Sequence, residues 1–236
     1  MVKINLKGPI VSNSSKSVYD WLGWEACCPK DVTDHLPDTG EDVELIVNSP
    51  GGIVDCGSEM YTALMEYEGN VTAKIVGMAA SAMSVAVMGA TKRVISPTGR
   101  MMVHNASRRA EGDHRAMASA GNSLSSADIG IRNAYKSRTG LSDEELTDLM
   151  NKETYLDAES AVSLGFADEV MFKNENEVVE AIASIEPGML PDETINKIIT
   201  IIAKEKPDDN QTPTDNSLAI KQMKNELLRE EILNSL

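Results

Sequence analysis

The chain has 236 residues, of which 42% are hydrophobic, and its formal net charge is -15 at pH 7. This size and composition predict a globular protein with one substantial core. The acidic balance argues against a nucleic-acid partner, because nucleic-acid binding needs a basic face.

The cysteines and the first residues indicate the compartment. The three cysteines include the adjacent pair Cys27 and Cys28, which argues against a disulfide framework and favours a reducing environment. Together with Cys56 and His35 they lack the spacing of zinc ligands, so no metal site is expected. The first ten residues contain no apolar signal segment, and no apolar run reaches the roughly 18 to 20 residues of a membrane span. We therefore expect a cytoplasmic protein with no membrane partner.

Strand-like and helix-like segments alternate along most of the chain. Strands are expected at residues 3–6, 43–47, 71–76, 93–95, 101–103 and 167–171. Helices are expected at residues 18–27, 54–67, 83–89, 113–139, 143–150 and 158–164. A capping box formed by Ser142 and Glu145 opens the helix at 143–150. This alternation predicts an α/β fold with a mainly parallel sheet and helices around it.

Two short motifs follow expected strands. The residues NSPGG at 48–52 end in paired glycines, which let the backbone turn sharply and point N–H groups at a neighbour. Ser81 lies between the strand that ends at Gly77 and the next helix, where the first amide groups are unpaired and partly positive. A serine there lies close to donors that can hold an oxyanion. An ordinary turn and a plain helix N-cap are the alternatives for these two motifs.

A histidine closes the third apolar segment. His104 ends the run RMMVH at 100–104 and precedes a polar loop. Histidine is the usual general base near neutral pH, and a purely structural histidine at a strand end is the alternative.

Four motifs in order resemble the proteolytic subunit of the Clp protease family (ClpP). They are NSPGG at 48–52, GMAAS at 77–81, RMMVHN at 100–105, and NKETYLDAESAV with LGFADEV at 151–170. The likeness covers about residues 3–172 of the chain. It implies a ClpP/crotonase-type spiral of ββα units with a protruding handle helix, and the activity of a serine endopeptidase on polypeptides.

The resemblance also implies a catalytic triad. Ser81 takes the place of the nucleophile, His104 that of the general base and Glu153 that of the acid, where the family usually has Asp. Glutamate still orients and stabilises an imidazole, since triads that end in Glu exist on other folds. Asp157 is the competing acid, although its place before the expected helix at 158–164 is typical of an N-cap.

The oxyanion donors implied by the resemblance are backbone N–H groups. They belong to Gly52 and Ala82, and a backbone donor tolerates the small residue that follows Ser81 in this chain. Peptide hydrolysis by such a site requires no metal or organic cofactor.

The helix expected at 113–139 is rich in Ala and Ser and has few apolar residues, namely Met117, Ile129, Ile131 and Ala134. Alone it would bury little, so we expect it to pack on another subunit. The resemblance implies that it is the handle helix of a ring-type homo-oligomer. The polar loop at 107–112 beside His104 is either a plain surface loop or a segment that orders on assembly.

We predict a protease domain at 1–186 and a C-terminal extension at 187–236. The extension contains two amphipathic helix candidates, one around residues 195–202 and one at 218–236, joined by an acidic linker at about 204–216. It is either a partly ordered tail or an assembly or scaffold-binding segment.

Three features together resemble the ClpP-like head-maturation proteases of tailed phages and prophages. They are the start of the chain on its first strand, the Glu at position 153 and the helical extension. Such an enzyme cleaves capsid or scaffold proteins in the bacterial host cytoplasm, within a prohead. One alternative is a housekeeping ClpP subunit that works with an ATP-dependent unfoldase, although the axial loops that dock the ATPase have no counterpart here. Another is a non-enzymatic assembly protein with a vestigial site. A crotonase-type acyl-CoA enzyme would not need Ser81 and His104 together, and a Ser-Lys peptidase usually has a membrane anchor.

Overall fold

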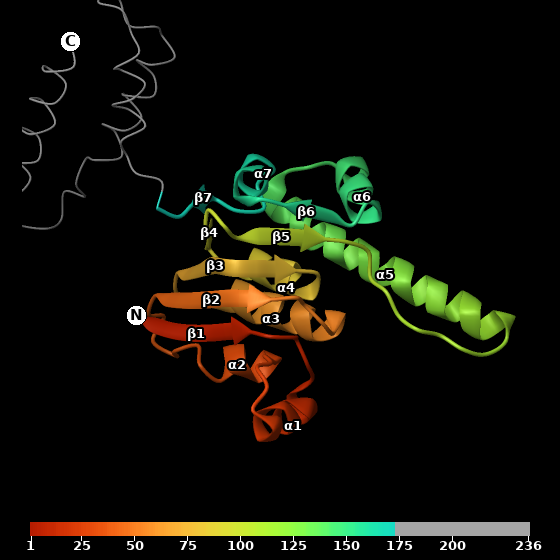
Figure 1. Cartoon of the computed structure of the whole chain (residues 1–236), viewed down its shortest axis with the longest axis horizontal. Coiled ribbons are helices and arrows are strands. Elements are labelled where there is room, and N and C mark those ends of the chain that lie inside the picture. The colour runs from red at the N-terminus through yellow and green to blue at the C-terminus, as the bar shows by residue number, and fades with distance from the viewer. Residues whose placement is uncertain (173–236) are drawn as a thin grey trace, which may run out of the picture. The chain divides into compact units, whose positions relative to one another are not determined.

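A seven-stranded sheet runs through the computed structural model of the chain, which describes residues 1–172 (Figure 1). Its strands are β1 (Val2–Lys7), β2 (Val43–Ser49), β3 (Val71–Ala80), β4 (Lys92–Ile95), β5 (Arg100–Val103), β6 (Thr154–Leu156) and β7 (Glu169–Val170). The parallel order is β1-β2-β3-β4-β7, while β5 pairs in parallel with the end of β3 and antiparallel with β6. The expected mainly parallel sheet is confirmed, but the short strand β6 was not predicted from the sequence.

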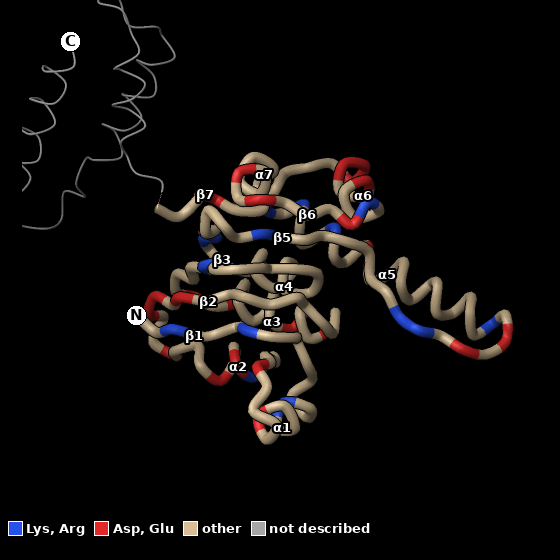
Figure 2. Tube along the Cα trace, viewed as in Figure 1, with Lys and Arg blue, Asp and Glu red and all other residues tan. Residues whose placement is uncertain are grey.

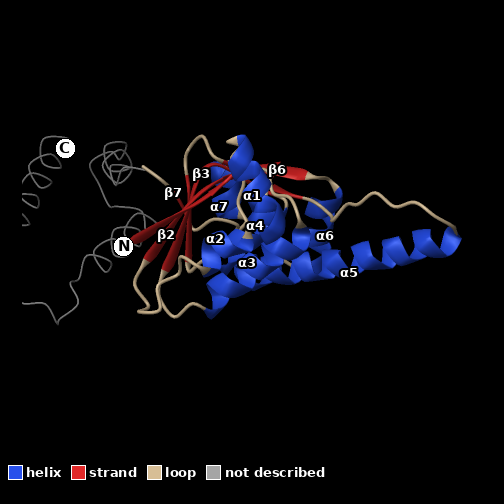
Figure 3. Cartoon of the chain, turned by 90° about the horizontal axis from the view of Figure 1, so that it is seen from below, coloured by secondary structure: helices blue, strands red, loops and turns tan. Residues whose placement is uncertain are grey.

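Seven helices and one 3-10 turn accompany this sheet in the described part of the chain. They are α1 (Asn13–Leu22), α2 (Pro29–Thr33), α3 (Val54–Glu66), α4 (Ala82–Ala86), the 3-10 turn η1 (Val87–Gly89), α5 (His114–Thr139), α6 (Asp143–Asn151) and α7 (Ala158–Ser163). Figure 3 shows α3, α4 and α5 on one side of the strands. The apolar core lies between these helices and the sheet, where Leu45, Val47 and Ile75 are fully buried.

The first helix lies earlier in the chain than the pattern predicted. The expected span 18–27 is wrong, because Ser12 accepts a hydrogen bond from the N–H of Ser15 and so caps a helix that begins at Asn13. Gly23 ends that helix in the left-handed region at φ 70°. The short helix α2, which begins at Pro29, was not predicted.

The strand before Ser81 does not end at Gly77, as the sequence suggested, but continues to Ala80. Its pairing with β2 contains a bulge, since Val47 faces Ile75 and Ser49 faces Ala79. The side chain of Asn48 fills the bulge, and its Oδ1 accepts the N–H of Met78 at 3.1 Å. A Cβ on Gly77 would lie 2.4 Å from that oxygen, so the glycine admits the side chain rather than ending the strand.

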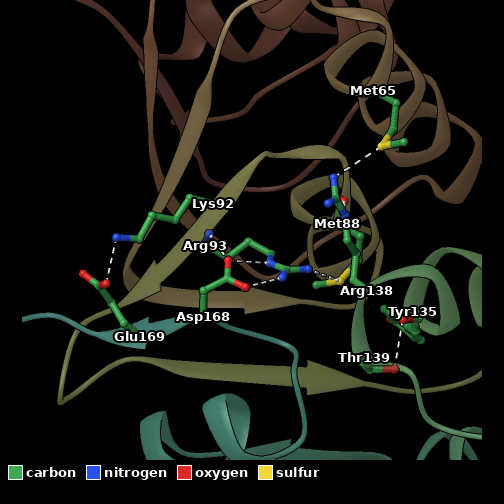
Figure 4. Close-up of polar contacts among 9 residues, drawn as sticks. All are labelled: Met65, Met88, Lys92, Arg93, Tyr135, Arg138, Thr139, Asp168 and Glu169. Atoms are coloured by element: carbon green, nitrogen blue, oxygen red, sulfur yellow. Dashed lines mark hydrogen bonds and ion pairs between the residues drawn. The ribbon is translucent and has the colours of Figure 1, made fainter. Parts of the chain in front are cut away.

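Helix α5 projects well beyond the sheet (Figure 1). Of its 26 residues only Ile131, Ala134 and Tyr135 are buried, which agrees with the few apolar residues noted in its sequence. Arg138 fixes its C-terminal end, because its Nε donates to the carbonyl oxygen of Met88 at 2.7 Å (Figure 4).

One ion pair joins β4 to the segment before β7. The Arg93 side chain is 4% exposed, and it donates to both carboxylate oxygens of Asp168, from Nε at 3.2 Å and from a terminal nitrogen at 2.5 Å (Figure 4). Partial burial of Asp168 opposes ionisation, but the hydrogen bonds from Arg93 outweigh it and lower the pKa of the Asp168 carboxyl.

Two units are distinguished along the chain, Met1–Phe172 and Lys173–Leu236. The predicted boundary at 186, the linker at 204–216 and the helices expected around 195–202 and at 218–236 all lie outside the described residues. They stay predictions.

Candidate active site

Ser81 and His104 meet at the carboxyl end of the sheet. Ser81 follows β3 and His104 follows β5, and the parallel pairing of these strands brings their ends together. The N–H of Ser81 donates to the carbonyl oxygen of Met102 at 2.9 Å, which fixes the two ends in register. Nε2 of His104 lies 2.7 Å from Oγ of Ser81, within hydrogen-bond distance. This is the geometry of a serine nucleophile beside its general base.

The backbone of Ser81 is strained. Its φ of 55° and ψ of -126° lie where an L residue is rarely found, and such strain costs on the order of 1–3 kcal/mol. Its side chain makes no capping hydrogen bond to α4, so it is not the plain N-cap considered as the alternative. A sharp strand-to-helix turn of this kind exposes the serine oxygen, as in the nucleophile elbow of the α/β-hydrolases.

The paired glycines lie directly against this turn. A Cβ on Gly51 would come within 2.5 Å of the Ala80 oxygen and 2.7 Å of the Ser81 Cβ. A Cβ on Gly52 would lie 2.2 Å from the oxygen of Ile10, whose N–H in turn donates to the Gly51 carbonyl at 2.8 Å. The backbone of residues 51 and 52 comes this close to its neighbours only because neither residue has a side chain.

A small cavity of about 40 Å³ lies over the site. Gly52, Ser81, Ala82 and His104 all contribute to its lining. Within residues 1–172 neither the N–H of Gly52 nor that of Ala82 donates a hydrogen bond. Two unused backbone donors therefore border the same space as the serine oxygen.

The strand register separates the two candidate acids. In the antiparallel pair β5–β6, Val103 faces Thr154, so the next residues along are His104 and Glu153. Asp157 lies beyond the other end of the pair, where Leu156 faces Met101. Glu153 is exposed, has φ 49°, and its carboxylate makes no hydrogen bond or ion pair within the described residues. Glu153 therefore lies at the end of the β5–β6 pair that leads to His104, and Asp157 lies at the opposite end.

Asp157 has the capping role expected from the sequence. Its carboxylate accepts the N–H of Ser160 at 2.8 Å and caps α7. This backbone hydrogen bond lowers the pKa of the Asp157 carboxyl. The capping box of Ser142 and Glu145 at α6 is likewise confirmed.

Other polar residues around the site escaped the sequence analysis. Asp128 of α5 accepts the N–H of Ala106 at 2.7 Å and so holds the chain just after His104. Ser84 and Tyr135 form a buried hydrogen bond one helical turn behind Ser81. The spacing of Ser84, three residues after Ser81 on the same turn, was the only sequence signal for this pair.

The described residues contain no group of three or more His, Cys, Asp or Glu side chains placed to hold a metal ion. Among the same residues, no helix combines the length and apolar character that crossing a membrane requires.

The comparisons with known proteins agree with this geometry. The Clp protease family matches residues 34–174 of the chain. An ATP-dependent Clp protease proteolytic subunit of Dehalococcoides mccartyi is 29% identical over 141 residues, which cover 59% of this chain and 70% of the relative. A protein of the same description from Oltmannsiellopsis viridis is 33% identical over 136 residues, covering 55% of this chain and 68% of the relative. The matched segment includes Gly52, Ser81, His104 and Glu153. The chain therefore belongs to the Clp protease family and is a serine-type peptidase.

Proposed function

We propose that Ser81, His104 and Glu153 form the catalytic triad of this peptidase. The observation that carries the proposal is the 2.7 Å distance between His104 Nε2 and Ser81 Oγ on a strained turn. The strand register supports the choice of acid, because Glu153 and His104 follow the same end of the β5–β6 pair. In the proposed triad the Glu153 carboxylate accepts a hydrogen bond from the ring during the reaction and keeps the imidazole in the tautomer that accepts the serine proton.

The chemistry follows from these positions. His104 Nε2 takes the Ser81 proton as Oγ attacks the peptide carbonyl carbon, and the carbonyl oxygen becomes an oxyanion. The N–H groups of Gly52 and Ala82, which line the cavity, donate to that oxyanion. The histidine then gives its proton to the leaving amine, and water releases the acyl group from Ser81 by the same steps. Loss of one oxyanion donor typically costs about 100- to 1,000-fold in rate.

The physiological substrate in this proposal is a phage capsid or scaffold protein, cleaved within a prohead in the host cytoplasm. Two sequence features support it. Glu stands at position 153, and residues 175–236, which contain two amphipathic helix patterns, follow the segment that matches the family. Both resemble the head-maturation branch of ClpP-like proteases.

A second candidate is favoured by the curated relatives. They are described as proteolytic subunits of an ATP-dependent Clp protease. In this second candidate the chain degrades polypeptides that a partner ATPase unfolds. The two candidates share one active site and differ in how the substrate reaches it.

Self-assembly is part of the proposal for either substrate. Between Arg115 and Arg132 the sequence of α5 has a single charged residue, Asp128, although most of this segment is exposed (Figure 2). Met117 is 41% exposed and Ile129 is 52% exposed. A projecting helix with few charges and exposed apolar side chains suits a contact with another copy of the chain in a ring.

The first experiment tests the site. The wild-type full chain, Ser81→Ala and the exposed-site control Ser17→Ala are treated with a fluorophosphonate and read by intact mass. One adduct on the wild type and on Ser17→Ala, and none on Ser81→Ala, supports the proposal. Equal labelling of folded Ser81→Ala, or no labelling of the folded wild type, contradicts it and favours the assembly-protein alternative.

The second experiment separates the substrates. The full chain is incubated with proheads that carry scaffold protein, and in parallel with a degron-tagged folded protein, a Clp ATPase and ATP. Cleavage of the scaffold without ATP supports head maturation. ATP-dependent loss of the tagged protein, with intact scaffold, supports the ATPase-linked role instead.

A further inference from the structure

A buried chain of hydrogen bonds runs from α5 to the peptide unit that joins Ser81 to Ala82. The hydroxyl of Ser84 donates to the Ser81 carbonyl oxygen at 2.6 Å. Oη of Tyr135 lies 2.8 Å from Oγ of Ser84, and both residues are 0% exposed. Because a serine hydroxyl has one proton and a carbonyl only accepts, the proton in the second bond comes from Tyr135.

These hydrogen bonds act on the oxyanion donor through the geometry of the peptide bond. The Ser81 carbonyl and the Ala82 N–H belong to one planar trans unit and point in opposite directions. A bond that holds the carbonyl oxygen therefore also holds the direction of the Ala82 N–H. The backbone N–H groups of Ser84 and Val85 reach the same oxygen at 3.0 and 3.3 Å, so the hydroxyl makes the shortest of its three contacts. A hydrogen bond at the carbonyl also polarises the unit and strengthens the N–H as a donor.

Tyr135 is itself held firmly. Its ring packs edge-on against Phe166, with centroids 5.2 Å apart. One turn further along α5, Thr139 donates to the Tyr135 carbonyl at 3.0 Å, and Arg138 is bonded to the Met88 carbonyl (Figure 4). Burial raises the pKa of the Tyr135 phenol, so that it stays protonated and remains a donor at neutral pH. Tyr135 also lines the cavity that holds Ser81 and His104.

A purely structural role predicts something different. A buried pair that only fills space could be replaced by apolar groups of the same shape at little cost to the reaction. Here the pair ends on the carbonyl of the nucleophile, and no second described side chain bonds that oxygen. These hydrogen bonds are linked to catalysis because they end on the Ser81 carbonyl, and not because they are buried.

We propose that Ser84 and Tyr135 are positioning residues that aim the Ala82 N–H at the oxyanion and thereby connect α5 to the active site. The inference rests on the proposed function, because it requires Ala82 to be an oxyanion donor. Misdirecting a donor removes part of the 100- to 1,000-fold effect of losing it. We therefore expect Ser84→Ala to lower the maximal rate of serine labelling about 10- to 100-fold, and Tyr135→Phe to lower it less.

The test measures fluorophosphonate inactivation of the full chain at several probe concentrations, which separates kinact from KI. The variants are Ser84→Ala, Tyr135→Phe and their combination. Ser137→Ala is the matched control, since it removes a hydroxyl that donates to a backbone carbonyl of the same helix, that of Ala134 at 2.8 Å. Urea unfolding of each variant reports stability separately.

The expected result is a lower kinact with KI unchanged within about twofold, and a double variant no slower than Ser84→Ala, because both residues act through one carbonyl. If Ser84→Ala does not fold, the conservative Tyr135→Phe decides alone. Wild-type kinact in the folded variants, additive effects, or a loss equal to that of Ser137→Ala overturns the inference. Ser81→Ala is measured alongside. If the wild type labels and Ser81→Ala does not, a negative result at Ser84 counts against positioning and not against the nucleophile.

Discussion

Gly51→Ala is a substitution for which the structure predicts a large effect on the Ser81 turn although it changes no reacting group. Gly51 has φ +87°, and a Cβ there would lie 2.5 Å from the Ala80 oxygen, 2.7 Å from the Ser81 Cβ and 2.9 Å from the Ala82 nitrogen. All three atoms belong to the turn that presents the proposed nucleophile and one proposed oxyanion donor. None of them is the free end of a flexible side chain, so the turn itself must move.

The expected loss of unfolding free energy has two parts, and a substitution at a second glycine separates them. The left-handed conformation costs an alanine roughly 1–2 kcal/mol, and forcing an extra carbon into packed surroundings adds about 1–3 kcal/mol. Gly23 has φ +70° with nothing within 4 Å of its Cβ position, so Gly23→Ala pays only the first cost. We therefore expect Gly51→Ala to lose about 2–5 kcal/mol of unfolding free energy and Gly23→Ala about 1–2 kcal/mol.

The assay combines urea unfolding with the rate of fluorophosphonate labelling. A displacement near 1 Å of reacting groups typically costs about 100-fold in rate, and we expect that loss in Gly51→Ala and none in Gly23→Ala. Wild-type labelling by Gly51→Ala, with a stability equal to that of Gly23→Ala, would refute the argument that the glycine loop supports the nucleophile turn.

Three further predictions test the acid, an ion pair and assembly. Glu153→Gln should lower activity about 1,000-fold or more, while Asp157→Asn keeps the rate within about twofold and lowers stability by about 1 kcal/mol; the reverse pattern would reassign the acid. Asp168→Asn leaves the buried Arg93 unpaired and should cost less than the roughly 3–5 kcal/mol of a fully buried pair, because Asp168 is 37% exposed. The folded-state pKa of Asp168 is lowered, so its stabilising effect is present above the unfolded pKa of about 3.9 and is lost as the pH falls through the folded value. The unfolding free energies of the variant and the wild type, measured with urea, should therefore converge below about pH 4. Met117→Glu should shift sedimentation toward smaller species, and an unchanged profile would count against packing of α5 on another copy.

Much of the site could be predicted from the sequence because its residues occupy chain positions with a distinct local chemistry. The paired glycines and Ser81 sit at strand ends, and these positions depend only on local alternation of strand and helix. The role of Asp157 followed in the same way, since an N-cap is determined within four residues of the chain. The early start of α1 at Asn13 was missed because the capping serine was overlooked, although the signal was present.

Other features of the molecule could be recognised only from the folded structure. The continuation of β3 past Gly77 depends on the Asn48 side chain of a neighbouring strand, so no local pattern in β3 could reveal it. The pairing that leaves Glu153 and His104 at the same end of β5 and β6 joins segments about fifty residues apart. It depends on β6, which has only three residues and is too short to be recognised alone.

The sequence by itself determined most of the strands and helices, though not β6 or α2, together with the turn at Ser81 and the motifs of the Clp protease family, because these depend on neighbours along the chain. Only the tertiary structure decided which distant groups meet: His104 at the Ser81 oxygen, and Tyr135 behind Ser84 at the Ser81 carbonyl. Those contacts are set by strand register and by the packing of α5 on α4, and both are properties of the folded chain as a whole.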